Sequence, residues 1–173
     1  MSNEERQLLA YDFFFFGGEN NSYGFQTSNE ISYEIKFKPM FYLFEPQKEY
    51  ANSAYEFVIE VFENTTNNTP SYDDLMPVTI ATIIEDFYNK IKQPLIIYVC
   101  DSSDGRQLAR NSKFTRWFEA YADNRYTKIE VILLDKSGER VPTVMILRNN
   151  NPYFSEIISD FQKILIGYND DDK

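Results

Sequence analysis

Hydrophobic and polar residues alternate regularly in two segments of the first half of the chain. In the first segment the apolar positions are Ile31, Tyr33, Ile35 and Phe37, and in the second they are Tyr55, Phe57, Ile59 and Val61. A period of two is typical of a β-strand with one buried face and one face in water. Together with an aromatic strand at 10–16 and a hairpin partner at 22–27, these segments predict an N-terminal antiparallel meander. Residues 40–44, between two prolines, have no clear assignment.

The pattern changes near residue 70 to one that alternates strands and helices. Ser71 and Asp74 form a capping box and Pro77 suits the first turn, which predicts a helix running to about Lys92. Residues 94–100 form a continuous apolar run, typical of a strand covered on both faces. A helix at 106–123, a hairpin of 129–134 with 140–147, and a last helix capped by Asn151 and opened by Pro152 complete the chain.

These elements predict an α+β fold in one domain over residues 1–173. The N-terminal meander continues into a mixed central sheet, and about three helices pack on it. The end segments 1–8 and 168–173 are polar or acidic, and we expect them to be flexible.

The composition excludes several kinds of chemistry. The chain has 15 Phe and 13 Tyr but no histidine and a single cysteine. Catalysis by Ser-His-Asp or Cys-His arrangements is therefore excluded, and zinc would lack its usual ligands. No metal or cofactor is predicted, and no catalytic residue can be assigned. No apolar run is long enough to cross a bilayer and no signal-peptide pattern is present, which favours a cytoplasmic location.

The charge of the chain is strongly negative but unevenly distributed. The formal net charge is −10; residues 1–99 carry 15 acidic and 6 basic side chains, whereas residues 100–150 carry 7 acidic and 9 basic ones. The negative chain repels the phosphates of nucleic acids, whose binding needs clustered cations, so nucleic-acid binding is disfavoured. A protein partner, in particular a basic one, suits this charge better.

The clearest candidate for a ligand site is the turn between the covered strand and the following helix, because α/β folds place ligands at that point. The residues concerned are Asp101, Ser102, Asp104, Gly105 and Arg106, continued along one stripe of the helix by Arg110, Lys113 and Trp117. Backbone amides at Gly105 and the cations could hold an anion. In the alternative interpretation the turn is structural, with Asp104 as N-cap, and the stripe is a solvated flank.

Two further features have structural explanations that compete with functional ones. Glu34-Ile35-Lys36 matches the Glu-x-Lys half of a restriction-type nuclease motif, with Asp12 as the nearby second acid, but the wet face of any alternating strand gives the same pattern. Cys100, at the end of the covered strand, is expected to be a small core residue.

Several of these residues also carry a resemblance to a known family. Tyr98-Val99-Cys100-Asp101, Asp104, Arg106-Gln107, Arg110 and Phe114-x-x-Trp117-Phe118, together with Tyr11-x-Phe13 and the hairpin through Tyr23 and Phe25, resemble an uncharacterised family of small bacterial proteins over residues 10–165. The resemblance implies no activity.

A second resemblance concerns the order of the elements. Strand, helix, strand, helix and two antiparallel strands is similar to the core and C-terminal half of the GNAT acyltransferases, which hold the coenzyme A pyrophosphate on a glycine-rich turn. The corresponding residues 74–78 contain no glycine. The resemblance therefore implies a GNAT-like scaffold that lacks the phosphate loop.

The sequence does not specify an activity. It favours an intracellular bacterial protein-interaction module, such as an acidic inhibitor, immunity protein or antitoxin that neutralises a basic toxin or nuclease. The alternative is an enzyme on a GNAT-like scaffold that binds a nucleotide or acyl-CoA at the Asp101–Arg106 turn.

Overall fold

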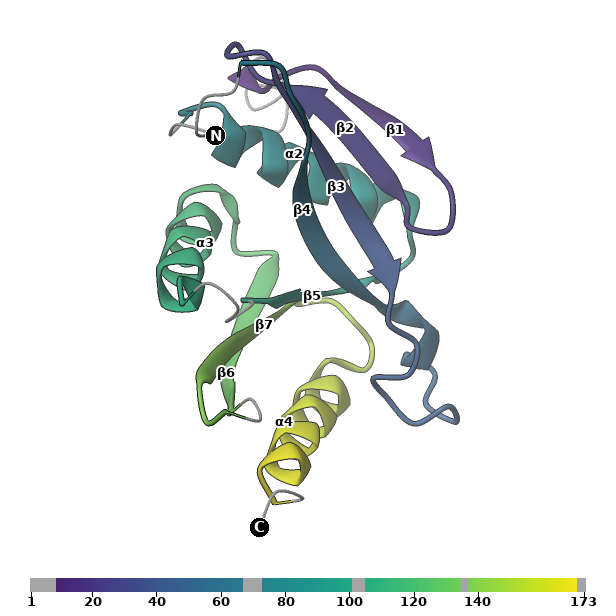
Figure 1. Cartoon of the computed structure of the whole chain (residues 1–173). Coiled ribbons are helices and arrows are strands. Elements are labelled where there is room, and N and C mark those ends of the chain that lie inside the picture. The colour runs from purple at the N-terminus through teal and green to yellow at the C-terminus, as the bar shows by residue number, and fades with distance from the viewer. Residues whose placement is uncertain (1–8, 67–72, 101–104, 135–136, 171–173) are drawn as a thin grey trace.

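In the residues that the structure describes, the chain forms a seven-stranded sheet with strand order β1-β2-β3-β4-β5-β7-β6 and three long α-helices (Figure 1). The computed structural model describes residues 9–66, 73–100, 105–134 and 137–170. The strands are β1 (Phe13–Gly17), β2 (Ser22–Gln26), β3 (Ile31–Pro39), β4 (Ala54–Asn64), β5 (Leu95–Val99), β6 (Tyr126–Leu134) and β7 (Arg140–Arg148). The helices are α2 (Met76–Lys90), α3 (Gln107–Tyr121) and α4 (Phe154–Asp170), and a 3-10 turn, η1 (Ala51–Ser53), precedes β4. The predicted α+β class is confirmed.

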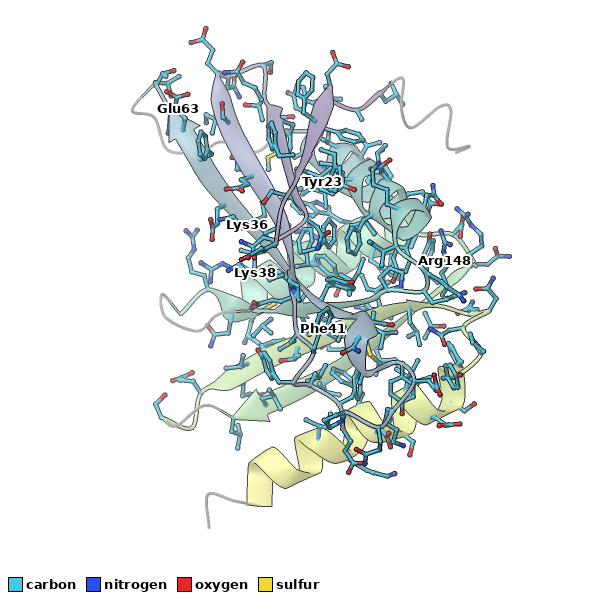
Figure 2. The ribbon with its side chains drawn as sticks, turned by 90° about the vertical axis from the view of Figure 1, so that its right-hand side faces the viewer. Tyr23, Lys36, Lys38, Phe41, Glu63 and Arg148 are labelled. Carbon is cyan, nitrogen blue, oxygen red and sulfur yellow. The ribbon has the colours of Figure 1, made fainter. Side chains whose placement is uncertain are left out.

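The first four strands form the predicted antiparallel meander, because their alternation lets one face be buried while the other stays in water. On β3 the odd-numbered side chains are buried and the even-numbered ones are partly exposed. Figure 2 shows Tyr23 on the side of the sheet that faces α2, with Lys36 and Lys38 on the opposite side. We call the latter the outer face of the meander.

Helix α2 is anchored to the inner face of the meander by aromatic packing. The ring of Phe87 stacks on that of Phe37, with centroids 3.9 Å apart and planes inclined by 3°. The Tyr23 hydroxyl donates a hydrogen bond of 2.8 Å to the Asp86 carboxylate. Burial, and then the bond to Asp86, raise the pKa of Tyr23. An apolar contact and a polar contact thus fix the same helix.

The central strand β5 joins the meander to the rest of the sheet. It pairs in parallel with β4 at three positions, from Ala54–Leu95 to Glu56–Ile97, and antiparallel with β7. Ile96 belongs to the core that includes α2, whereas Leu95 and Ile97 belong to a second core with Ile157 and Phe161 of α4. The predicted covering of this strand on both faces is confirmed.

Strands β4 and β5 separate after their three paired positions. Aromatic side chains fill the space between them: the ring of Tyr98 stacks on that of Phe114, with centroids 4.5 Å apart, and the ring of Phe57 lies 5.8 Å from that of Tyr98. Phe114 is the most deeply buried apolar residue of α3. The contacts of the Phe114 ring with Phe57 and Tyr98 therefore also anchor α3 to β4 and β5.

The structure corrects several predicted boundaries. Helix α2 begins at Met76 with no side-chain cap on Leu75, so the proposed capping box is wrong for this helix; instead the Asp73 carboxylate accepts a bond of 2.9 Å from the Leu75 N–H, and Ser71 lies outside the described residues. The helix ends at Lys90, because Ile91 is extended. Strand β6 starts at Tyr126, three residues earlier than predicted. Asn151 precedes α4 and accepts a bond of 2.9 Å from the Tyr153 N–H.

Within the described part of the chain, no helix combines the length and the apolar character needed to cross a bilayer.

The Phe37–Phe87 stack leads to a prediction about stability. Phe87→Ala should lower the free energy of unfolding by about 3–5 kcal/mol, because it leaves a cavity between α2 and the sheet. Phe62→Ala, on the outer face, should change it by less than about 0.5 kcal/mol. Urea unfolding followed by tryptophan fluorescence measures both. Equal losses in the two variants would show that α2 is not anchored in this way.

Candidate functional site

The predicted turn after β5 is only partly visible. Asp101, Ser102 and Asp104 lie outside the described residues. Gly105 has φ +69°, a left-handed conformation that favours glycine, and Arg106 is the N-cap of α3 without a side-chain capping bond. The following Gln107 is buried, and its Oε1 has no hydrogen-bond partner. In the described ranges no three acidic or thiol side chains gather in a way that could hold a metal ion.

The stripe predicted along α3 is partly assembled. The Lys113 ammonium lies 4.8 Å from the centroid of the Trp117 ring, close enough for a cation–π interaction. Burial, and then the neighbouring Arg116, lower the pKa of Lys113. Trp117 also lines a cavity beneath the helix, so it is not a purely solvated residue.

Arg110 does not join the Lys113–Trp117 pair and lies instead near Tyr98 and Cys100, at the end of β5. It is close enough to Tyr98 and Cys100 to oppose electrostatically the rise in their pKa values that burial causes. Cys100 is fully buried, and its pKa is raised above the ordinary thiol value. The prediction that Cys100 is a core residue is confirmed, and the raised pKa opposes a nucleophilic role.

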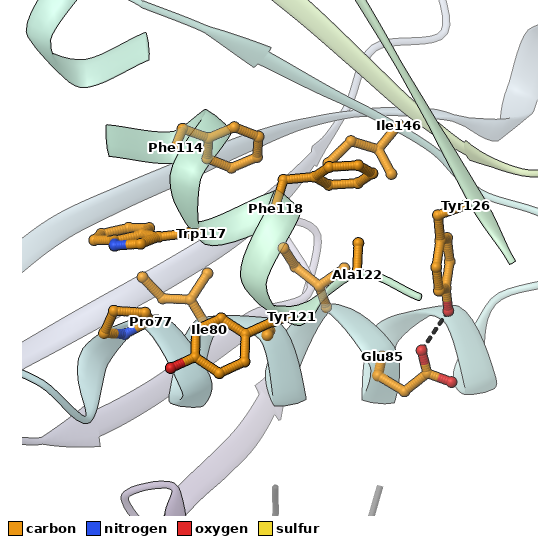
Figure 3. A pocket seen from close by; sticks show the side chains of 12 residues that line it. Pro77, Ile80, Glu85, Phe114, Trp117, Phe118, Tyr121, Ala122, Tyr126 and Ile146 are labelled. Atoms are coloured by element: carbon orange, nitrogen blue, oxygen red, sulfur yellow. Dashed lines mark hydrogen bonds between the residues drawn. The ribbon is translucent and has the colours of Figure 1, made fainter. Parts of the chain in front are cut away.

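An apolar cavity separates α2 from α3 (Figure 3). Its volume is about 50 Å³, and it is lined by Trp117 and Phe118 of α3 and by Ile80 of α2. The other lining residues are Pro77, Ala81, Ile84, Glu85, Phe114, Tyr121, Ala122, Tyr126 and Ile146. Since a cavity of about 150 Å³ holds benzene, this one admits only a small apolar group unless α3 moves.

A buried carboxylate closes one end of this cavity. Glu85 accepts a hydrogen bond from the Tyr126 hydroxyl and forms ion pairs with Arg125 at 3.2 Å and Arg148 at 3.6 Å. Burial, followed by the bond to Glu85, raises the pKa of Tyr126 to about 12. A buried carboxylate needs such partners, so the cluster mainly ties α2 to β6 and β7.

A hollow larger than this cavity lies on the outer face of the meander. It is a groove of about 810 Å³ whose aromatic walls are Phe14 and Phe16 of β1 and Phe62 of β4. These side chains are 68%, 70% and 75% exposed. We call this the outer groove; its floor includes Ser22, Gly24, Gln26, Ser32 and Glu34, and Asp12 also lines it.

Gly24 determines the shape of the groove at β1. A Cβ atom at this position would lie 2.6 Å from the Phe16 ring, so any larger residue would push that ring away. Gly24 also pairs with Phe14 on one side and Glu34 on the other. Because Gly24 has no side chain, the Phe16 ring can pack directly against strand β2.

Charged side chains continue the outer face across β3 and β4. The Lys36 ammonium lies 3.3 Å from the Glu34 carboxylate and 2.6 Å from that of Glu60. The bond to Lys36 is the main reason why the pKa of Glu60 is lowered. The Glu34-x-Lys36 pattern thus forms an ion-pair network, which supports its structural explanation over the nuclease one.

The raised pKa of Tyr126 predicts a pH-dependent loss of stability. The folded form holds the phenol proton up to about pH 12, whereas the unfolded form releases it near the ordinary value of 10.0. The stabilisation is therefore complete below pH 10 and is lost as the pH rises toward 12. The difference in unfolding free energy between wild type and Tyr126→Phe should shrink over that window. Tyr42→Phe, at an 80% exposed position, should show no difference at any pH, and a constant gap for Tyr126→Phe would contradict the assignment.

The comparisons with known proteins identify a family but no function. Neither the curated proteins nor the solved structures compared with the chain include a significant match. Residues 72–163 match the model of a family of unknown function, DUF6169. The match covers α2, β5, α3, β6, β7 and the first part of α4. Since it spans more than half of the 173 residues, the chain belongs to this family of unknown function.

Proposed function

We propose that the protein is a protein-interaction module that binds a basic partner protein in its outer groove. The observation that carries the proposal is the exposure of Phe14, Phe16 and Phe62 around one hollow. Single exposed apolar residues are common, but a group of large ones around a groove marks an interaction site. Aromatic anchors with a polar rim are also what protein interfaces use.

The charge of the groove and of the whole chain favours a basic partner. Asp12 and Glu34 line the groove, and Glu60 lies beside Glu34 on β4. Lys36 balances one of these charges and leaves the surface acidic. The net charge of −10 would attract a cationic protein over long range and speed the encounter. This combination fits an acidic inhibitor of the immunity or antitoxin kind, acting in the bacterial cytoplasm.

The prediction concerns retention of a partner by immobilised protein. Wild type should retain a basic protein from a lysate of the source cells, identified by mass spectrometry, and Phe62→Ala or Phe14→Ala should weaken its binding about 30-fold, the effect of losing an aromatic anchor of about 2 kcal/mol. With the purified partner, affinity should fall about tenfold or more between about 50 and 300 mM salt.

Tyr42→Ala is the matched control, because Tyr42 is 80% exposed but does not line the groove. It should bind the partner like wild type. If the partner binds equally well to the Phe62→Ala variant, or binds more tightly at high salt, the outer groove is not the binding surface.

A second candidate function is binding of an acyl-CoA or nucleotide. The observed order of β4, α2, β5, α3, β6 and β7 supports it, because this is the order that the GNAT resemblance implies. The apolar cavity between α2 and α3 could take part of a ligand. Against it, Phe57, Tyr98 and Phe114 fill the gap between β4 and β5, and residues 73–78 include no glycine.

Thermal unfolding distinguishes the two functions. A ligand at 100 times its dissociation constant adds about 2.7 kcal/mol, which for a chain of this size raises the Tm by roughly 5–10 °C. Because the gap is filled, we expect coenzyme A, acetyl-CoA and nucleotides, with or without magnesium, to raise the Tm by less than about 1 °C. A larger rise that disappears in Arg106→Ala and Arg110→Ala would favour the second function instead.

A further inference from the structure

We propose that two copies of the chain associate by pairing their β1 strands, antiparallel and edge to edge about a two-fold axis, into one continuous sheet. The inference goes beyond the proposed function, because it concerns backbone pairing at the edge of β1, although Phe14 and Phe16 of that strand also line the outer groove. It rests on the position of β1 in the sheet, its sequence, the faces that its four phenylalanines occupy and the charge around it.

Among the residues that the structure describes, no other strand covers the outer edge of β1. It stands at one end of the sheet, where its only partner among the described residues is β2, and Figure 1 shows it as the outermost strand of the meander. From Phe13 to Gly18 the chain has no charged residue and no proline. Edge strands otherwise carry charges or prolines that prevent pairing with another chain. Strand β6, at the opposite end of the sheet, carries Lys128 and Glu130.

The four phenylalanines of β1 make this edge complementary to itself. Phe14 and Phe16 lie on the outer face, while the rings of Phe13 and Phe15 contact Tyr23 on the inner face. Phe15 is still 43% exposed, although it lies on the face that α2 covers. In a two-fold antiparallel pair, each face of one strand meets the same face of its partner, which places aromatic rings opposite aromatic rings.

The local charge allows a second copy to approach. The acidic residues flanking this uncharged stretch are Asp12 and Glu19, and the Lys90 ammonium lies 5.2 Å from the centroid of the Phe15 ring. Repulsion between two chains of net charge −10 acts at longer range. At physiological ionic strength it is screened beyond about 8 Å. Direct contact at β1 is therefore between nearly neutral surfaces.

The exposed area suits a small interface that stops at two copies. A buried phenylalanine contributes on the order of 150–250 Å². The exposed parts of Phe14, Phe15 and Phe16 in two copies therefore supply roughly 500–900 Å² before the backbone is counted, compared with about 1,200 Å² for a small specific interface. The bulge between Phe15 and Gly17 ends the regular ladder, so the pairing is short. Each copy has one such edge, so the assembly closes as a dimer.

Sedimentation velocity tests the inference on the full chain, from about 1 to 200 µM protein, at about 50 and 500 mM sodium chloride. The expected result is a species of twice the 20.4 kDa monomer mass that forms at least threefold more tightly at the higher salt, since salt screens the repulsion. Hydrogen exchange of the amides of 13–17 should slow as the protein concentration rises, because edge pairing protects backbone amides.

Phe14→Lys and Phe62→Lys form a matched pair of variants, both at exposed positions of the outer face. Phe14→Lys should abolish the dimer, because it places an unpaired charge from each copy in the aromatic contact at the edge, whereas Phe62→Lys, three strands away on β4, should leave it intact. A monomer at all concentrations and both salts overturns the inference. So does a dimer that survives Phe14→Lys, or one lost equally in Phe62→Lys.

The proposed partner binding and the proposed β1 pairing can be contradicted independently of each other. Partner binding should weaken with salt and should weaken about 30-fold in Phe62→Ala, whereas self-association should strengthen with salt and survive in that variant. A monomer that still retains the basic partner would contradict only the β1 pairing. A dimer that retains no partner would contradict only the proposed function.

Discussion

The short parallel contact between β4 and β5 determines how this molecule is built. β4 pairs with β3 along nearly its whole length, but with β5 only from Ala54 to Glu56. Beyond that contact the two strands have no further paired positions. There the rings of Phe57, Tyr98 and Phe114 contact one another. Since Phe114 belongs to α3, these ring contacts also position that helix. The cavity lies between it and α2.

The parting of the strands also divides the sheet into two halves with different surroundings. The C-terminal half is covered on both faces, by α2 and α3 on one side and by α4 on the other. By the residues that the structure describes, the meander is covered on its inner face only, so its outer face remains in water. An outer face with only polar residues would require no explanation. This one carries Phe14, Phe16 and Phe62, and it is this departure from the alternating pattern that supports a binding role.

The sequence predicts those parts of the structure that depend on local patterns. Alternation on β3 and β4 and the apolar run of β5 give the correct strands, because burial follows from the side-chain period. The predicted covering fails only toward the end of β4, where Val61 is exposed. The four consecutive phenylalanines of β1 have no such period, so nothing in the sequence shows that Phe14 and Phe16 face outward. The start of α2 was misplaced because a capping box is a local signal, and here the Asp73 carboxylate binds the Leu75 N–H ahead of the helix.

The candidate sites were harder to predict because their residues come together from distant parts of the chain. The outer groove needs Gly24 opposite Phe14 and Phe62 three strands away, and the cavity is lined by residues from Pro77 to Ile146. On α3, Trp117 was predicted as a binding residue, and it does meet Lys113, but it also faces the cavity. Asp101, Ser102 and Asp104 are outside the described residues, so their role stays a prediction.

The family match and the proposed surface occupy different parts of the chain. The match begins at residue 72, after β1–β4, and covers α2, the C-terminal strands and most of the helical residues. If the outer groove binds a partner, the choice of partner is therefore set by residues outside the part that defines the family. Beside the groove, Lys36 pairs with both Glu34 and Glu60 and so removes one of two negative charges. In the proposed complex a cationic group of the partner would meet a weakened local charge there, so the net charge of the whole chain would govern the encounter and the three phenylalanine rings would supply most of the affinity.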